Sequence, residues 1–206
     1  MLAMLERAPR VSARAVIFPH TRLEVTGDHV AAAVRFAVES GADEVLAIGV
    51  LHRAMADEFS LDAFDALLAL SKKPSLRVHR RFPPETGDDL AELAARMPVV
   101  ATADPLHHGV GYGDAPADAR RAEDSYDFAR ASIEAQLRAL SSHDFDAFAA
   151  ECARVRSDFK RSGPALARAL GPGFSFGVRE LALVDYAEAL GAAPPTWVAG
   201  ALVTIG

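Results

Sequence analysis

Short apolar runs alternate along the chain with longer segments whose apolar positions repeat every three or four residues. Three of the runs stop at proline, glycine or a polar turn, and they predict buried strands at residues 14–18, 44–49 and 99–102. Between the first two runs, the repeat predicts a helix that ends near Gly41, where a helix terminus favours glycine. The order strand–helix–strand over residues 14–50 predicts a parallel pair of strands.

The rest of the chain continues this alternation. Ser60 caps a predicted helix, and Pro164 lies in the first turn of another one. The predicted helices cover residues 61–70, 88–96, two pieces within 118–161, and a segment from 163 onward. Strands are predicted at 77–79 and 197–205, residues 106–116 read as an irregular loop, and 181–190 fits either a helix or a strand. We expect one α/β domain over residues 1–206, with a central, mostly parallel mixed sheet flanked by helices.

Composition narrows the class of protein. Half of the 206 residues are hydrophobic, which is enough for one substantial core. The 28 acidic and 22 basic residues give a net charge of −6, which argues against a nucleic-acid partner. A single cysteine excludes an intramolecular disulfide and favours the cytoplasm. No apolar run approaches the roughly 20 residues of a membrane span, so no membrane partner is expected.

Three histidines follow predicted strands. His20 follows the first strand, His52 the second and His107 the third, with Asp104 three residues before His107. Turns at the carboxyl ends of neighbouring strands converge on one crevice. Neutral imidazoles with an anionic ligand suit Fe(II), Zn(II) or Cu, and two histidines with one carboxylate leave coordination positions open. One such histidine alone would be read as a surface residue, but three predict a metal site. The remaining histidines lack this placement and are expected to be solvent-facing or structural: His29, His79 and His143.

The same turns resemble the Memo family, which is related to the LigB-type class III extradiol dioxygenases. Residues 18–21 (FPHT) are similar to that family's Pro-His-Ala-Gly segment, and residues 48–52 (IGVLH) to its strand ending in Gly-Pro-Ser-His. Residues 101–109 (ATADPLHHG) are similar to its Ser-Ser-Asp-x-x-His-x-Gly turn. Residues 184–187 and 198–205 resemble its closing helix and strand. The matches follow the family order and span residues 14–205.

The resemblance implies a metal site at these turns. It implies that His20 and His52 bind the metal, and that Asp104 and His107 line the same pocket. A pocket histidine can move protons and a carboxylate can orient it, so we expect His107 to be the catalytic acid or base and Asp104 its partner. The chain departs from the family in lacking a Glu-His-Ser segment between His52 and Val99, which removes a wall of the pocket.

The third metal ligand has three alternatives. The family places a cysteine shortly before a proline-led helix, but Cys152 lies too early and in register with a buried helical face. Asp158, ahead of Pro164, lies closer to the expected place and would complete a two-histidine, one-carboxylate set. Asp158 is equally consistent with a solvated aspartate at a helix end. The alternatives are therefore Asp158, Cys152 or no third ligand.

Three functions fit these residues. The first is a mononuclear, Fe(II)-dependent dioxygenase-like enzyme for a small catecholic or enolic substrate, with Zn or Cu as alternative metals. The second is a Memo-like protein that binds a metal or ligand without turnover, and the third is a metal-dependent hydrolase. We expect a small-molecule substrate to contact Arg22, His108 and Tyr112, because Arg22 adds a cation beside His20 and the other two lie on the turn after the third strand. If the apolar closing strand lies at a sheet edge, it would pair with a second copy in a homo-oligomer.

Overall fold

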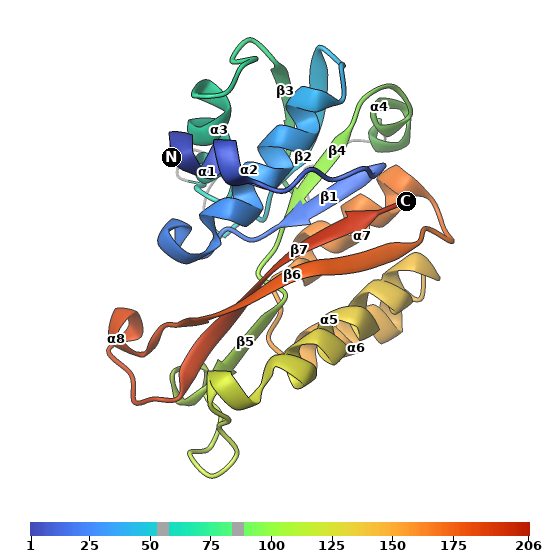
Figure 1. Cartoon of the computed structure of the whole chain (residues 1–206). Coiled ribbons are helices and arrows are strands. Elements are labelled where there is room, and N and C mark those ends of the chain that lie inside the picture. The colour runs from blue at the N-terminus through green and yellow to red at the C-terminus, as the bar shows by residue number, and fades with distance from the viewer. Residues whose placement is uncertain (53–57, 84–88) are drawn as a thin grey trace.

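A seven-stranded mixed sheet forms the centre of the computed structural model, which describes residues 1–52, 58–83 and 89–206 (Figure 1). Four parallel strands make one half of the sheet, in the order β3-β2-β4-β1, and three antiparallel strands continue it through β7. The strand bounds are β1 Ala15–Phe18, β2 Glu44–Ile48, β3 Arg77–Arg81, β4 Val99–Thr102, β5 Leu106–Gly109, β6 Phe176–Asp185 and β7 Thr196–Ile205. The α/β class with a mixed sheet is as expected from the sequence.

Helices cover both faces of this sheet (Figure 1). One face carries α1 (Leu2–Arg7), α2 (Leu23–Glu39) and α3 (Asp62–Ala69). The other carries α4 (Leu90–Arg96), α5 (Tyr126–Ser141), α6 (Phe145–Arg154) and α7 (Phe159–Leu170). A short helix, α8 (Ala187–Leu190), links β6 to β7. Residue 88, where a helix was expected to begin, lies outside the described residues.

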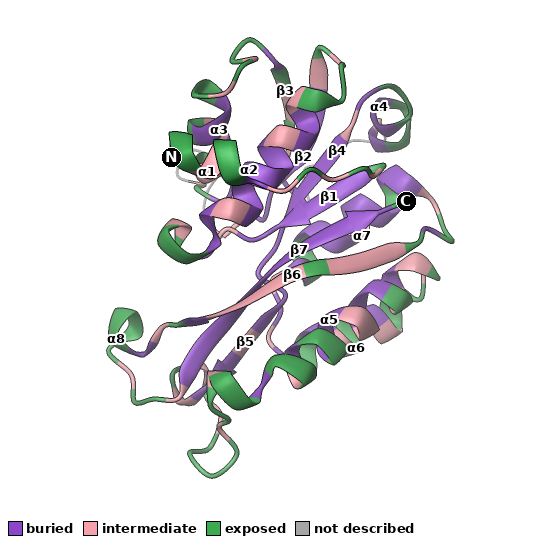
Figure 2. Ribbon diagram, in the orientation of Figure 1, coloured by how far each residue is buried: buried purple, intermediate pink, exposed green. Residues whose placement is uncertain are grey.

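Alternating side chains of the central strands pack into two hydrophobic cores, one on each face of the sheet. In β1, Ala15 and Ile17 join the core under α4–α7, whereas Val16 and Phe18 join the core under α1–α3. This follows from the two-residue period of a strand. Both faces are covered, so the strand reads as one continuous apolar run rather than an alternating one. Figure 2 shows the result as buried central strands between helices whose outer faces are exposed.

β1 and β5 lie one after the other along the same side of β7. Ile17 pairs with Val203, and Leu106 pairs with Ala199, so three residues of β7 separate the two pairings. Both strands run antiparallel to β7, and they therefore run in the same direction as each other. β1 ends close to the point where β5 begins. At this break the chain leaves the end of β1, and it enters β5 from the end of β4.

Residues 106–116 were predicted to form an irregular loop, and this was wrong for residues 106–109. Leu106–Gly109 forms β5, because the segment pairs with residues 196–199 of β7, a contact that no local pattern shows. The condition for pairing of the closing strand with a second copy is not met, because β7 is paired on both sides and β6 lies at the edge instead.

Two further segments differ from the predictions. The ambiguous segment 181–190 is strand up to Asp185 and helix from Ala187. Pro164 lies inside α7 rather than in its first turn, because the helix begins at Phe159, whose buried ring packs 5.4 Å from that of Phe148. Among the described residues, no helix combines the length and the apolar character needed to cross a membrane.

Candidate metal centre

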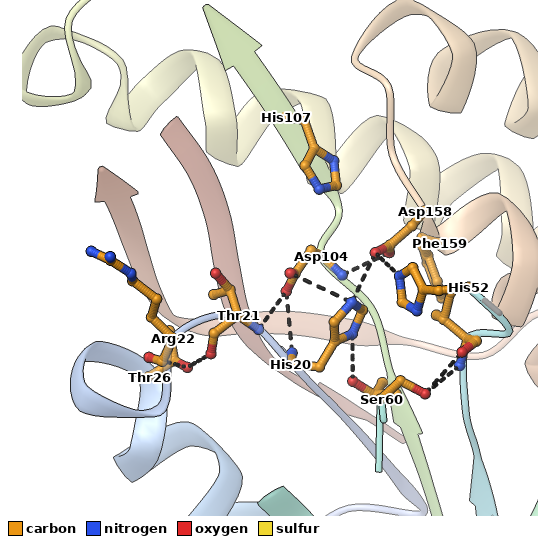
Figure 3. A network of polar contacts seen from close by, with 12 residues as sticks. His20, Thr21, Arg22, Thr26, His52, Ser60, Asp104, His107, Asp158 and Phe159 are labelled. Atoms are coloured by element: carbon orange, nitrogen blue, oxygen red, sulfur yellow. Dashed lines mark hydrogen bonds and ion pairs between the residues drawn. The ribbon is translucent and has the colours of Figure 1, made fainter. Parts of the chain in front are cut away.

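Two histidines and two aspartates meet at the carboxyl edge of the parallel strands. His20 follows β1, His52 follows β2, and Asp104 follows β4, which lies between those two strands in the sheet. Asp158 comes from the start of α7 and completes the group (Figure 3). The strand order explains the convergence, because three neighbouring parallel strands end at the same edge.

The closest approach in this group is to Asp158. Its Oδ2 lies 3.0 Å from His20 Nε2 and 3.5 Å from His52 Nε2. The carboxylate of Asp104 lies slightly farther away, with its Oδ2 3.6 Å from His20 Nε2. The side chains of His20, Asp104 and Asp158 are 6%, 6% and 12% exposed, and that of His52 is 25% exposed, so most of the group is shielded from water.

Glu58 orients His52. Its buried carboxylate accepts hydrogen bonds from the backbone N–H of His52 and from Phe59 and Ser60, and its Oε1 lies 3.2 Å from His52 Nδ1. A carboxylate beside Nδ1 keeps the proton on that nitrogen and leaves the Nε2 lone pair free for a metal. Sequence reasoning missed Glu58. The only signal was a carboxylate six residues after His52, which is not specific.

Thr102 orients the ring of His20, as Glu58 orients that of His52. Its Oγ1 lies 3.1 Å from His20 Nδ1, at the end of the neighbouring strand β4. Both histidines therefore turn Nδ1 toward an oxygen of the protein and Nε2 toward Asp158. The ring centroids of His20 and His52 are 4.8 Å apart and the rings are nearly perpendicular.

Backbone N–H groups hold the two carboxylates. Asp104 Oδ1 accepts hydrogen bonds from the backbone of His20 at 3.2 Å and of Thr21 at 3.3 Å. Asp158 Oδ1 accepts one from the backbone of Asp104 at 2.8 Å. In each carboxylate, one oxygen is held by the backbone and the other faces the imidazoles.

The charges of this group are coupled. Burial alone would lower the pKa of His20, but Asp104 and Asp158 outweigh it and raise the pKa to about 9. Burial would raise the pKa of Asp158, yet His20 and His52 hold it well below its usual range. Burial raises the pKa of Asp104 and the neighbouring Asp158 adds to this, partly opposed by His20. Without a metal, a protonated His20 therefore offsets part of the negative charge of this group.

His107 reaches the group from the opposite side, on β5 (Figure 3). Its Nδ1 donates a hydrogen bond of 2.8 Å to the carbonyl of Arg156, which can only accept. The proton is thereby fixed on Nδ1, and Nε2 is left to bind a ligand or a proton. Nδ1 is thus bound by Arg156 and not by Asp104, whose Oδ1 accepts hydrogen bonds from the turn after β1. Asp104 as the catalytic partner of His107 stays a prediction.

Two overlapping sets of residues have the geometry of a metal site. His20, His52 and Asp158 form one, and Asp104, His107 and Asp158 form the other; within each, the ligand atoms all lie within 4.8 Å of one another. The first set has two orientated imidazoles and a carboxylate, a combination suited to Fe(II), Zn(II) or Cu. The residues present therefore fit the metal that the sequence predicted.

Of the expected substrate contacts, Tyr112 lies beside the centre. Its ring centroid is 4.9 Å from that of His107. Burial raises the pKa of Tyr112, and the nearby Tyr186, Asp104 and Asp158 raise it further, so its phenol stays protonated. Tyr186, whose oxygen accepts a 2.6 Å hydrogen bond from Thr21, was missed as a site residue.

Arg22 and His108 are not brought to the imidazoles. Arg22 points away from them (Figure 3), and its guanidinium lies 5.5 Å from the ring centre of Tyr186. His108 follows His107 on β5 and therefore faces the other side of the sheet. There its Nδ1 lies 2.9 Å from Asp114 and its ring lies 5.0 Å from that of Trp197.

Cys152 lies in the core and not among the ligands. It is fully buried, and its Sγ lies 3.4 Å from Gln136 Oε1. Burial raises the pKa of this thiol to about 12, so it does not offer a thiolate. Of the alternatives for the third ligand, Asp158 is the one that the structure places beside the two histidines.

No protein-family model matches this chain, and no curated protein matches it.

Proposed function

We propose that the protein is a metal-dependent oxidoreductase of the dioxygenase type, with Fe(II) held by His20, His52 and Asp158 and a small catecholic or enolic substrate. The observation that carries the proposal is the convergence of two imidazole nitrogens and one carboxylate oxygen at the strand ends. Two histidines with one carboxylate form the ligand set of non-haem Fe(II) oxygenases, because it leaves positions open. The reaction class is taken by analogy from the class III extradiol dioxygenases, to which the family that the turns resemble is related.

The roles of the side chains follow from their contacts. Bound Fe(II) supplies the redox chemistry that couples molecular oxygen to an organic substrate. His107 Nε2 accepts the proton that a phenol or enol releases on binding, since its Nδ1 is already committed to Arg156. The protonated phenol of Tyr112 donates a hydrogen bond to a substrate oxygen. The buried surroundings exclude bulk water and strengthen each of these interactions.

Two other functions start from the same centre. A protein that binds metal without turnover would keep the same ligands and consume no oxygen. A hydrolase would use Zn(II) with the same residues, because the ligand set alone does not fix the metal. The proposed dioxygenase reaction, ring cleavage of a catechol, differs from both in what it consumes and produces. It breaks one carbon–carbon bond of the substrate, places both atoms of O₂ in the product and needs no external reductant.

The first experiment measures bound metal. Protein purified anaerobically without a tag is loaded with Fe(II), and its iron is measured by elemental analysis. Tight, stoichiometric iron is expected in the native protein, with affinity at least about 100-fold weaker in His20→Ala and Asp158→Ala, since losing a ligand costs at least as much as losing its supporting residue. His79→Ala removes a histidine outside the centre and should leave iron unchanged.

The second experiment measures turnover. Oxygen uptake is followed with a panel of catechols and enols, and one O₂ should be consumed for each ring-opened product. Tight iron without oxygen uptake on any panel member would select the non-catalytic alternative. Hydrolysis that appears with Zn(II) and not with Fe(II) would select the hydrolase. No bound metal under any loading condition would contradict all three.

A further inference from the structure

We propose that Asp104, His107 and Asp158 form a second, weaker divalent-cation site, and that an ion there inhibits the enzyme by occupying His107. This inference rests on the proposed function, because the first ion at His20, His52 and Asp158 is its neighbour. The two sets share Asp158 and differ in their other members. The centre would therefore hold one ion in its active form and two when divalent metal is in excess.

His107 is preorganised as a ligand. The carbonyl of Arg156 takes the Nδ1 proton at 2.8 Å, which leaves Nε2 as the free donor atom. The backbone N–H of His107 donates to the Val155 carbonyl at 3.0 Å, so the residue is anchored at both its backbone and its ring. Arg156 has a φ of 54°, a left-handed backbone that is rare for arginine and that accompanies this carbonyl contact. A ring fixed in this way loses little entropy when it binds an ion.

Each carboxylate has an oxygen to offer. Asp104 Oδ1 is held by two backbone N–H groups, and Oδ2 is free of hydrogen bonds from them. Asp158 Oδ1 accepts from the Asp104 backbone, and Oδ2 faces the first set. One carboxylate common to two cations is a frequent arrangement in centres whose ions lie about 3.5–4 Å apart. Two carboxylates and one imidazole suit a hard cation such as Mn(II).

The second ion binds more weakly for electrostatic reasons. The first site has two imidazoles and the full charge of Asp158, whereas the second shares that charge with an ion already bound. Two divalent cations a few ångströms apart repel each other strongly in a buried site. We expect the second dissociation constant to exceed the first by at least about tenfold, which corresponds to about 1.4 kcal/mol.

Inhibition follows from the single lone pair of His107 Nε2. A nitrogen that holds a cation cannot accept the substrate proton. Loss of a general base costs about 100-fold or more in rate. Filling the second site should therefore lower oxygen uptake, whereas filling the first should raise it.

The experiment is a titration of metal-free protein with Mn(II), followed by electron paramagnetic resonance. Free Mn(II) gives the binding stoichiometry, and two ions sharing a carboxylate give a spin-coupled signal that one ion does not. The native chain should bind two ions per chain, and the coupled signal should appear only with the second. His107→Ala and Asp104→Asn should each bind one ion. His107→Ala should keep the first dissociation constant within about threefold, because His107 is not a member of the first set. His79→Ala, the matched control, should bind two.

The outcomes separate this inference from the proposed function. One ion per chain in the native protein at saturation overturns the second site and leaves the proposed function standing. Two ions that persist uncoupled in both His107→Ala and Asp104→Asn also overturn it, since the second ion then lies elsewhere. Binding of one ion by His107→Ala but of two by Asp104→Asn would restrict the site to His107 and Asp158 and overturn the three-residue form. No Mn(II) bound by the native chain overturns the second site, and the Fe(II) measurement then decides the proposed function by itself.

Discussion

The backbone N–H of Asp104 donates a 2.8 Å hydrogen bond to Asp158 Oδ1, which joins two residues that are 54 positions apart in the chain. The backbone N–H of Asp158 returns a longer contact of 3.4 Å to the Asp104 carbonyl. The end of β4 and the start of α7 are therefore fixed to each other independently of any metal. The positions of both carboxylates are set by the fold before an ion arrives, which favours tight and selective binding.

Removing Glu58 should weaken metal binding without removing a ligand. Glu58→Ala frees the His52 ring and its backbone N–H, and we expect the dissociation constant to rise about 10–100-fold, as for other residues that orient a histidine ligand. Glu58→Gln keeps an acceptor without the charge and should lose less. The measurement is competition against a chelating dye. Glu44→Ala disrupts a similar carboxylate–histidine pair at His79, 3.3 Å apart, and should have no effect on binding.

Metal binding should release a proton from His20. With a pKa of about 9, this imidazole is protonated at pH 7.5, and a metal must displace that proton from Nε2. Calorimetry in buffers of different ionisation enthalpy should give about one proton released per ion at pH 7.5, falling toward zero above pH 10. A constant value of zero at pH 7.5 would contradict the protonated state of His20 in the metal-free pocket.

The metal-free protein should lose stability as the pH rises. The pKa of His20 is raised from 6.5 to about 9 on folding, so the charged ring stabilises the fold fully below pH 6.5 and ceases to do so as the pH passes about 9. The shift corresponds to about 3 kcal/mol. Urea unfolding with a chelator present should show this loss between pH 6.5 and pH 9.5. His20→Asn should show a flatter profile over the same range, and an equal slope in both proteins would assign the loss to another group.

Replacing Cys152 should affect the fold and not the metal. Cys152→Ala removes a buried sulfur from the core next to Gln136, and we expect a loss of about 1 kcal/mol in the free energy of unfolding. The dissociation constant for metal should stay within about twofold of the native value. A loss of metal comparable to that in Asp158→Ala would make Cys152 the third ligand after all.

The strand ends were the part of the site that the sequence could predict. Apolar runs that stop at a turn predict where a strand ends, and His20, His52 and Asp104 each follow such a stop. Their convergence then depends only on the strands being parallel neighbours. The structure adds that β4 lies between β1 and β2, which puts Asp104 between the two histidines.

The distinction between His107 and His108 could not be predicted. The two are adjacent in sequence, and only their membership in a strand turns one toward the centre and the other toward Trp197. That strand exists because β7 pairs with it from about 90 residues away, which lies beyond local patterns. Glu58, Arg156 and Tyr186 were missed for the same reason, since each acts through a contact that the fold creates.

The break between β1 and β5 along β7 interrupts the hydrogen-bond ladder of the sheet. Where one strand stops short of the next, backbone N–H groups lose the partners that a continuous ladder would provide. At this break the N–H groups of His20 and Thr21 donate to Asp104, and the N–H of Asp104 donates to Asp158. The two acids thus complete the hydrogen bonding of an interrupted sheet. A chain that lost both acids would need new hydrogen-bond acceptors for these backbone N–H groups as well as new metal ligands. The evolution of the centre is therefore coupled to that of the fold.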